Sequence, residues 1–210
     1  MTEHKGWNSR GYLPHLDAAA LTQHVTFRLH GSLPASVVER LKADGDGVAY
    51  LSAVDEELDR GIGPVWLADP DCAAIVADAL GQFDGQRYDL LAWCVMPNHV
   101  HVLIRQVEGR PLGAIVKSWK SYTARMINRR LGRQGPLWAA DYFDRYIRDE
   151  DQMIGVMRYI EANPVKAGFC ARPEDWSFSS ASTERGPLGP QSRASISADR
   201  EVRAPFTPHR

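Results

Sequence analysis

The stretch that decides the fold is residues 94–104, Cys-Val-Met-Pro-Asn-His-Val-His-Val-Leu-Ile. It holds the end of one apolar segment, a Pro-Asn break and the start of a second apolar segment. Successive side chains of a β-strand point to opposite faces, so His99 and His101 share a face and Val100 points to the other. Two imidazoles in register on a hydrophobic strand are candidate metal ligands. Zinc, iron and simple core packing all remain open on this evidence alone.

The segments around this stretch predict a mixed α and β domain. The short junction at Pro97-Asn98 favours an antiparallel hairpin between strands 88–96 and 99–106. Apolar periodicity and turn residues indicate the other elements: a strand at 21–29, an extended segment at 138–148, and helices at 35–41, 48–60, 70–81, 112–131 and 149–162. Pro164 is expected to close the last helix. This order predicts an α+β fold, a ferredoxin-like antiparallel sheet with helices packed on one face.

The composition of the 210 residues supports one main domain, because 44% of them are hydrophobic. We expect an N-terminal arm at 1–20, a domain at 21–180 and a disordered tail at 181–210, where Ser, Pro, Gly and Arg dominate. No apolar run is long enough to cross a membrane, and the first residues lack a signal peptide. The three cysteines form no CxxC pair. We therefore expect free thiols in a reducing cytoplasm.

Positive charge is concentrated in the middle of the chain, although the net charge is only −1. Residues 105–148 contain ten Lys or Arg and three Asp or Glu, which points to an anionic partner. The alternative is a solvated helix with incidental basic residues. Side chains that could contact DNA phosphates are Lys117, Lys120, Arg125, Arg129, Arg133 and Arg148. Arg148 could equally pair with Asp144 or Glu150. Trp119 and Trp138 could stack on bases, or Trp119 could pack in the core.

The last helix supplies residues that could complete a site with the two histidines. Tyr159 and Asn163 are four residues apart, so they lie on one helical face. Two imidazoles and one amide oxygen would leave open positions on a divalent ion, which suits Mg²⁺ or Mn²⁺ bound together with a phosphate. Tyr122, on the basic helix, is a second candidate nucleophile, but only Tyr159 has an amide one turn away. His24 could line the site or be an ordinary sheet residue.

These parts suggest phosphoryl transfer to tyrosine. A phenol with a pKa of about 10 is a poor nucleophile unless its anion is stabilised. A metal on the scissile phosphate would neutralise developing charge and favour departure of the 3′ oxygen. The products would be a 5′-phosphotyrosine and a free 3′-hydroxyl. Because that linkage conserves the phosphodiester energy, it allows strand transfer as well as cleavage.

The motifs resemble a known family. Residues 97–101, Pro-Asn-His-Val-His, resemble the His-hydrophobic-His motif of the HUH single-strand nucleases. The run from Trp138 to Gly168 resembles the REP-associated tyrosine transposases, relatives of the single-tyrosine insertion-sequence transposases. Residues 175–180, Asp-Trp-Ser-Phe-Ser-Ser, are similar to their closing segment. The resemblance covers about residues 20–180.

The resemblance implies a catalytic domain with the HUH nuclease fold. It implies that His99, His101 and Asn163 bind Mg²⁺ or Mn²⁺, that Tyr159 is the nucleophile, and that the substrate is single-stranded DNA, often with a hairpin. A homodimer is left open, and no membrane partner is expected. The chain departs from the Gly-Thr-Trp-Ser signature near its first strand, where residues 21–26 read Leu-Thr-Gln-His-Val-Thr. REP sequences are therefore not implied as the substrate.

Two other function classes remain as alternatives. A catalytically silent DNA- or RNA-binding regulator could retain the fold, and a metal-dependent hydrolase of small phosphate compounds could use the histidines alone. The complete set of two histidines, a tyrosine and an asparagine disfavours the first. The basic stretch disfavours the second.

Overall fold

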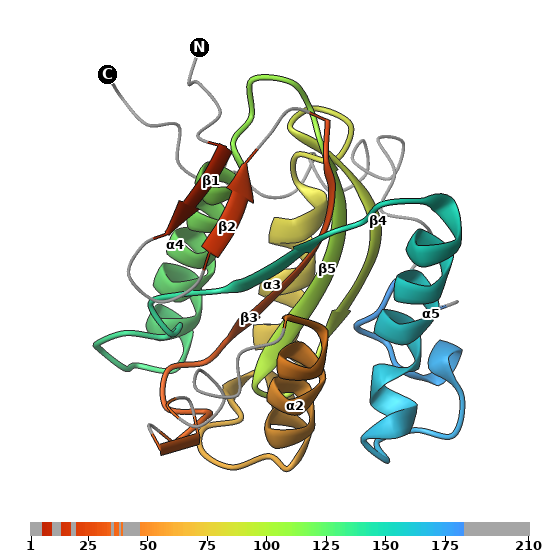
Figure 1. Cartoon of the computed structure of the whole chain (residues 1–210). Coiled ribbons are helices and arrows are strands. Elements are labelled where there is room, and N and C mark those ends of the chain that lie inside the picture. Colours follow the sequence, from red (N-terminus) through yellow and green to blue (C-terminus); the bar gives the residue numbers. More distant parts are fainter. Residues whose placement is uncertain are drawn as a thin grey trace, which may run out of the picture.

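A four-stranded antiparallel sheet forms the centre of the computed structural model (Figure 1). The structure describes residues 6–9, 14–17, 20–34, 36–37, 39 and 47–182. The strand order is β4-β5-β3-β6. Their bounds are Tyr88–Val95 for β4, His99–Gln106 for β5, Thr22–Arg28 for β3 and Phe143–Tyr146 for β6. The predicted α+β class and antiparallel sheet are confirmed.

The central antiparallel hairpin that the sequence predicts is present in the structure. β4 and β5 pair antiparallel, with Cys94 opposite His101 and Val95 opposite Val100. β5 also pairs with β3, which sets Thr26 opposite His101. The backbone N–H of Leu29 donates to the carbonyl of Asn98 at 2.8 Å, which ties the turn to the end of β3. β5 is therefore hydrogen-bonded on both edges, and its side chains are held on a rigid element.

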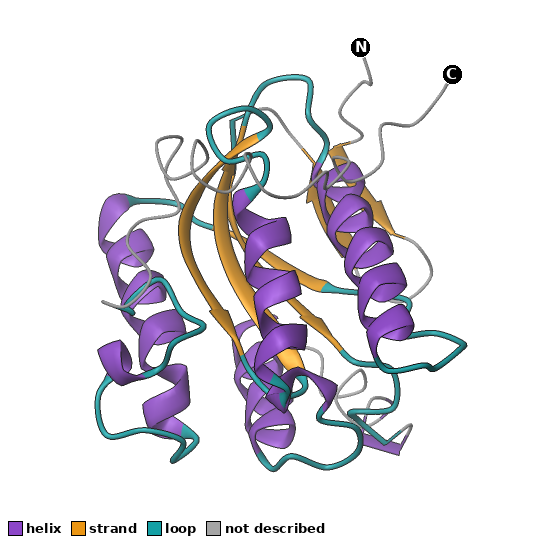
Figure 2. Cartoon of the chain, turned by 180° about the vertical axis from the view of Figure 1, so that it is seen from behind, coloured by secondary structure: helices purple, strands orange, loops and turns teal. Residues whose placement is uncertain are grey.

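Helices cover both faces of the sheet, so the predicted packing on one face is wrong. α3 (Pro70–Gly81) and α4 (Leu112–Arg130) pack on the face that carries Val100, Val102 and Ile104 (Figure 2). α5 (Glu150–Lys166) packs on the opposite face against Leu103, and α2 (Gly47–Asp59) contacts Phe143 on that same face. The reason is visible in β5, where seven of eight residues are buried. A strand buried on both faces needs a helical layer on each side.

α5 continues past the predicted end. Asp149 caps its start, with Oδ1 accepting from the N–H of Gln152 at 2.8 Å. Pro164 lies inside the helix and does not close it at Ala162. Proline removes only one backbone donor, and it lies in the last turn, where little of the helix depends on that bond. The helix ends where Gly168 takes a φ of +78° and the N–H of Phe169 donates to the carbonyl of Pro164.

Of the other elements predicted from the sequence, three helices are present and the extended segment is present in part. The helices predicted at 48–60, 70–81 and 112–131 correspond to α2, α3 and α4. Within the predicted extended segment 138–148, β6 forms only at Phe143–Tyr146. The predicted arm holds a two-stranded hairpin, β1 (Gly6–Ser9) with β2 (Pro14–Asp17), which no hydrophobic alternation announces. Most of the helix predicted at 35–41, and residues 183–210 of the predicted tail, lie outside the described residues.

Two short helices and a closing segment complete the described chain. They are η1 (Trp66–Ala68), before α3, and η2 (Pro173–Asp175), after α5. After η2 the chain runs along the edge of β4, where Val95 N–H donates to Phe178 O and Ser180 N–H donates to Trp93 O. This segment is the one that resembles the family's closing segment, and it covers the free edge of the sheet. None of the described helices has the length and apolar character needed to cross a bilayer.

Candidate active site

His99 and His101 lie side by side on β5, and both are fully buried. Their Nε2 atoms are 3.0 Å apart. Both rings stand on the sheet face that α5 covers, because Leu103, two residues on, packs against Ile160 of that helix. The predicted pair of convergent imidazoles is therefore present in the structure.

The outer nitrogens of both rings are held by neighbouring polar side chains. His99 Nδ1 lies 2.6 Å from Asn98 Oδ1. His101 Nδ1 lies 3.0 Å from Thr26 Oγ1 and 3.2 Å from His24 Nε2, both on β3. Such contacts fix the ring orientation and direct the Nε2 atoms to a common point. His24, which could have been an ordinary sheet residue, is thus part of the site.

Burial keeps these imidazoles neutral. It lowers the pKa of His101 and of His24 to about 3, and it holds the pKa of His99 well below its ordinary value. Lys166 lowers the pKa of His101 further, and His101 itself lowers the pKa of the other two. Neutral imidazole is the form that binds metal ions.

α5 brings the tyrosine and the asparagine to the histidines. Asn163 is buried, and its Nδ2 lies 3.1 Å from His101 Nε2. The ring of Tyr159 lies 6.0 Å from that of His101, centroid to centroid. Among the described residues, no hydrogen-bond partner meets Asn163 Oδ1. A buried amide oxygen without a partner is costly, so its presence beside the histidines requires an explanation.

Asp55 of α2 completes the site, and sequence reasoning missed it. The hydroxyl of Tyr159 donates to Asp55 Oδ2 at 2.6 Å. Asp55 Oδ1 lies 3.9 Å from His101 Nε2 and is buried without a hydrogen-bond partner in the described part of the chain. Asp55 belongs to an acidic run that reads as a solvated face. The sequence signal that could have identified Asp55 is its position next to Val54 and one helical turn before Leu58, two residues that are buried on α2.

A second acid, Asp59, lies one turn further along α2. Its Oδ2 is 3.8 Å from Lys166 Nζ, which is one helical turn beyond Asn163 on α5. Burial raises the pKa of Asp59 to about 6. α2 and α5 therefore face each other through acids on one helix and Tyr159, Asn163 and Lys166 on the other.

The surroundings of Tyr159 oppose its ionisation. Burial, and then the negative charge of Asp55, raise the pKa of the phenol above its ordinary value. Burial also raises the pKa of Asp55. The phenol therefore stays protonated and donates its hydrogen bond, and attack by its oxygen requires a partner for the proton and a cation near the developing charge.

The competing nucleophile lies on the wrong side of the sheet. Tyr122 belongs to α4, and its phenol faces Asp78 of α3 and Arg125 of its own helix. The sheet separates α4 from the histidines. Tyr159 is the tyrosine that the fold brings to them.

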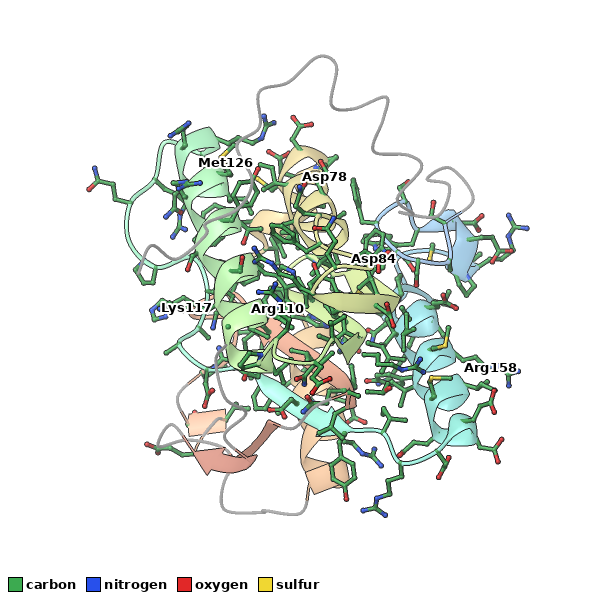
Figure 3. All side chains as sticks on the ribbon, turned by 90° about the horizontal axis from the view of Figure 1, so that it is seen from above. Asp78, Asp84, Arg110, Lys117, Met126 and Arg158 are labelled. Carbon is green, nitrogen blue, oxygen red and sulfur yellow. The ribbon has the colours of Figure 1, made fainter. Side chains whose placement is uncertain are left out.

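Most of the predicted DNA-contacting residues also lie on the far face. Lys117, Arg125 and Arg129 are exposed on α4, and Figure 3 shows Lys117 and Arg158 of α5 at opposite sides of the molecule. Lys120 Nζ donates to the carbonyls of Ala139, Ala140 and Asp141 at 2.7, 3.0 and 3.3 Å. Its ammonium thus holds the chain that leads to β6.

Arg133 and Arg148 take aromatic partners. The guanidinium of Arg133 lies 5.2 Å from the ring centroid of Trp66, and its Nη1 donates to Asn128 at 2.7 Å. The guanidinium of Arg148 lies 5.5 Å from the ring centroid of Tyr146. Contact with DNA remains a prediction for all six basic residues.

The two tryptophans considered for base stacking are core residues. Trp119 is 2% exposed and its Nε1 donates to Tyr88 Oη at 2.9 Å. Trp138 is buried and its Nε1 donates to Thr123 Oγ1 at 2.9 Å. Neither ring presents a face to solvent, so the stacking prediction is wrong for both. Both rings are buried because Trp119 lies on the side of α4 that packs on the sheet, and Trp138, in the segment that leads to β6, packs into the same core.

Comparison with known proteins relates both the sequence around this site and the fold to transposases. Residues 72–163, which include both histidines of β5, Tyr159 and Asn163, match the model of the family described as "Transposase IS200 like". A solved structure described as a REP-associated tyrosine transposase bound to a REP hairpin has the same fold. It superposes with a TM-score of 0.51 at 19% identity, over 85% of this chain and 82% of that one.

A curated relative comes from Haemophilus influenzae. It is named as a REP-associated tyrosine transposase and is 28% identical over 103 residues, which are 44% of this chain. The match spans 58% of the relative's length. The resemblance to the REP-associated tyrosine transposases that the sequence predicts is confirmed by these comparisons.

The residues present fit a divalent metal ion. Two neutral imidazole nitrogens converge, and rotation of the Asn163 amide by half a turn would exchange its nitrogen for the unpartnered oxygen. Within the part of the chain that the structure describes, no group of three His, Cys, Asp or Glu side chains is arranged to hold a metal. The amide of Asn163 is the further polar group that lies within hydrogen-bond distance of the Nε2 atom of His101.

Proposed function

We propose that this chain is a metal-dependent single-stranded DNA endonuclease and strand transferase, transposase-like, that acts on hairpin-containing DNA through a 5′-phosphotyrosine at Tyr159. The observation that carries the proposal is the hydrogen bond between Tyr159 and Asp55 beside two neutral imidazoles. Tyr159, Asp55 and the two histidines come from three elements to one place, which supports the roles of nucleophile, proton acceptor and metal ligands that we propose for them. The similarity to transposases supports DNA as the substrate.

His99, His101 and Asn163 would hold Mg²⁺ or Mn²⁺. When bound, the ion would neutralise charge on the scissile phosphate. Two imidazoles and an amide oxygen leave positions for phosphate oxygens, which is the arrangement that a metal-bound substrate needs. Asn98, Thr26 and His24 orient the rings from behind.

Tyr159 supplies the attacking oxygen. Its oxygen forms the bond to phosphorus while the bond from phosphorus to the 3′ oxygen breaks. Asp55 Oδ2, 2.6 Å from the phenol oxygen, is placed to receive the phenol proton. The departing 3′ oxygen takes a proton from water, and strand transfer runs the same exchange in reverse with a new 3′-hydroxyl.

The test is capture of the covalent intermediate. Because the 5′ phosphate stays on tyrosine, a hairpin oligonucleotide labelled at its 3′ end leaves its label on the protein. A library of hairpins with randomised flanks avoids the need to know the cognate sequence. We expect a denaturation-resistant labelled adduct in Mn²⁺ or Mg²⁺, its loss in Tyr159→Phe and its retention in Tyr122→Phe.

Two outcomes contradict the proposal. An adduct that survives in Tyr159→Phe and disappears in Tyr122→Phe would move the chemistry to α4. DNA binding without an adduct from any member of the library would favour the silent regulator.

A further inference from the structure

Exposed hydrophobic side chains gather around the β4–β5 turn. Five large hydrophobic residues are exposed among those the structure describes: Ile62, Val65, Trp66, Ile154 and Phe169. The first three lie in or beside η1, which is hydrogen-bonded to the turn, and Phe169 follows α5. Trp66 is 42% exposed and Phe169 is 47% exposed. Single exposed apolar residues are ordinary, but two exposed aromatic rings beside a candidate active site call for an explanation.

Trp66 is held in place by the backbone around it. The N–H of the next residue, Leu67, donates to Pro97 O in the turn at 3.1 Å. The loop before η1 requires a glycine at position 63, because φ there is +89° and a Cβ would clash with Gly31 O. The guanidinium of Arg133 lies 5.2 Å from the ring centroid. The ring and its cation are therefore positioned in advance.

Phe169 is fixed to the same turn by a different route. Its ring stacks on Trp176, with centroids 5.5 Å apart and 28° between the planes. Trp176 Nε1 donates to Val95 O, at the end of β4, at 3.0 Å. Phe169 is thus connected to Val95 through Trp176, Trp66 is connected to Pro97 through Leu67, and His99 follows two residues after Pro97.

These features suit unpaired nucleotides better than a protein partner. Every base has a π face that stacks on an aromatic ring, and a guanidinium beside the ring can meet a phosphate or the base itself. A stable protein interface needs a continuous apolar area. Here the exposed side chains form two groups separated by a turn whose Asn98 is buried and hydrogen-bonded to Leu58 O.

We propose that Trp66, with Arg133, and Phe169 are stacking surfaces for unpaired bases that flank a DNA hairpin, next to the site formed by His99, His101 and Tyr159. This inference rests on the proposed function and adds the residues that would hold the single-stranded flank. It concerns binding alone and requires no further chemistry.

The experiment compares two oligonucleotides that share one hairpin stem. One has unpaired thymidine flanks and the other is blunt, and binding is followed by fluorescence anisotropy without added divalent ion, so that no cleavage occurs. We expect Trp66→Ala to weaken binding of the flanked hairpin about tenfold and to leave the blunt hairpin within about twofold. Trp66→Phe retains a ring and should keep most of the affinity. Phe169→Ala should weaken binding of the flanked hairpin severalfold.

Ile154→Ala is the matched control, because Ile154 is 38% exposed in the first turns of α5, away from the turn. It should leave both affinities unchanged. Thermal melting of each variant separates loss of a contact from loss of folding.

Several results would overturn the inference. If Trp66→Ala and Phe169→Ala both bind the flanked hairpin with wild-type affinity while the parent chain still forms the Tyr159 adduct, the two rings are not stacking surfaces. The proposed function would then still stand. If the parent chain forms no adduct and binds the flanked and blunt hairpins equally well, both the inference and the proposed function are wrong. Concentration-dependent dimers that dissociate in Trp66→Ala, with DNA affinity unchanged, would assign the surface to a second copy of the chain.

Discussion

The two faces of the central sheet are built in opposite ways. On the face covered by α3 and α4, aromatic and aliphatic side chains pack together, and the buried polar atoms that lack a partner within the described part of the chain belong to neutral side chains, Ser118 and Gln106. Trp119 Nε1 donates to the hydroxyl of Tyr88, which donates to Leu80 O at 2.6 Å. On the face covered by α2 and α5, three buried histidines meet two acids, and oxygens of Asp55 and Asn163 lack hydrogen-bond partners in the described part of the chain.

The difference agrees with the proposed function, which assigns the chemistry to the face covered by α2 and α5. A buried polar atom without a partner costs roughly 1 to 3 kcal/mol. A face that retains such atoms beside neutral imidazoles stays poised for a ligand at the expense of stability. Adjacent residues of β5 belong to the two faces, so single substitutions can separate the two contributions.

The largest effect is expected from one pair of neighbours on β5. His101→Gln removes a proposed metal ligand and should lower the rate of adduct formation at least about 100-fold, with little change in the melting temperature. Val102→Ala, one residue on and on the other face, should cost about 2 kcal/mol of unfolding free energy and keep the adduct. Denaturant titration and the labelled-hairpin assay measure both. Equal loss of stability in the two variants would contradict the division of the faces.

Asp55 offers the next largest effect. Asp55→Asn keeps the size of the side chain but removes a strong proton acceptor, so adduct formation should slow at least about 10-fold. Binding of Mn²⁺, followed by calorimetry, should be unchanged, because the proposed ligands are His99, His101 and Asn163. Loss of Mn²⁺ binding in this variant would show instead that Asp55 is a ligand.

Lys120 and Lys117 test the basic residues of the packed face. Lys120→Met removes three hydrogen bonds to carbonyls and should cost about 1 to 2 kcal/mol of stability. Lys117→Met, on the exposed surface of the same helix, should leave stability within about 0.5 kcal/mol. If Lys117 contacts a phosphate, its variant should also lower the salt dependence of DNA affinity by about one unit of slope. A change of slope in Lys120→Met and none in Lys117→Met would reverse the two roles.

The smallest effect concerns Asp59 and pH. Burial raises the pKa of Asp59 to about 6, so the folded state holds its proton more tightly than the unfolded state. Its contribution to stability is therefore complete below about pH 4 and is lost as the pH rises through 6. Asp59→Asn should be more stable than the parent by about 1 kcal/mol at pH 8, after allowance for solvent screening. The gain should vanish at pH 4. Thermal melting of the parent and the variant at pH 4 and at pH 8 measures it, and a gain of the same size at both pH values would contradict the prediction.

Local spacing in the chain was enough to predict the hairpin, the main helices and the four residues at the heart of the candidate site. His99 and His101 share a face because strand side chains alternate, and Tyr159 and Asn163 share a face because they are one helical turn apart. Both rules act over a few residues, so no tertiary contact was needed to apply them. The end of α5 was mispredicted because a proline in a last turn costs too little to stop the helix.

Tertiary packing decided the rest. Asp55 lies on α2, which packs against Leu33 and Phe143. The sequence offers several acids in the same run, and only this packing selects Asp55. The connections between the strands determine which face of the sheet the basic helix α4 covers. Because α4 covers the face opposite the histidines, Tyr122 and Lys117 lie away from them. Contacts between distant segments depend on the whole packing arrangement, and neither strand nor helix periodicity carries that information.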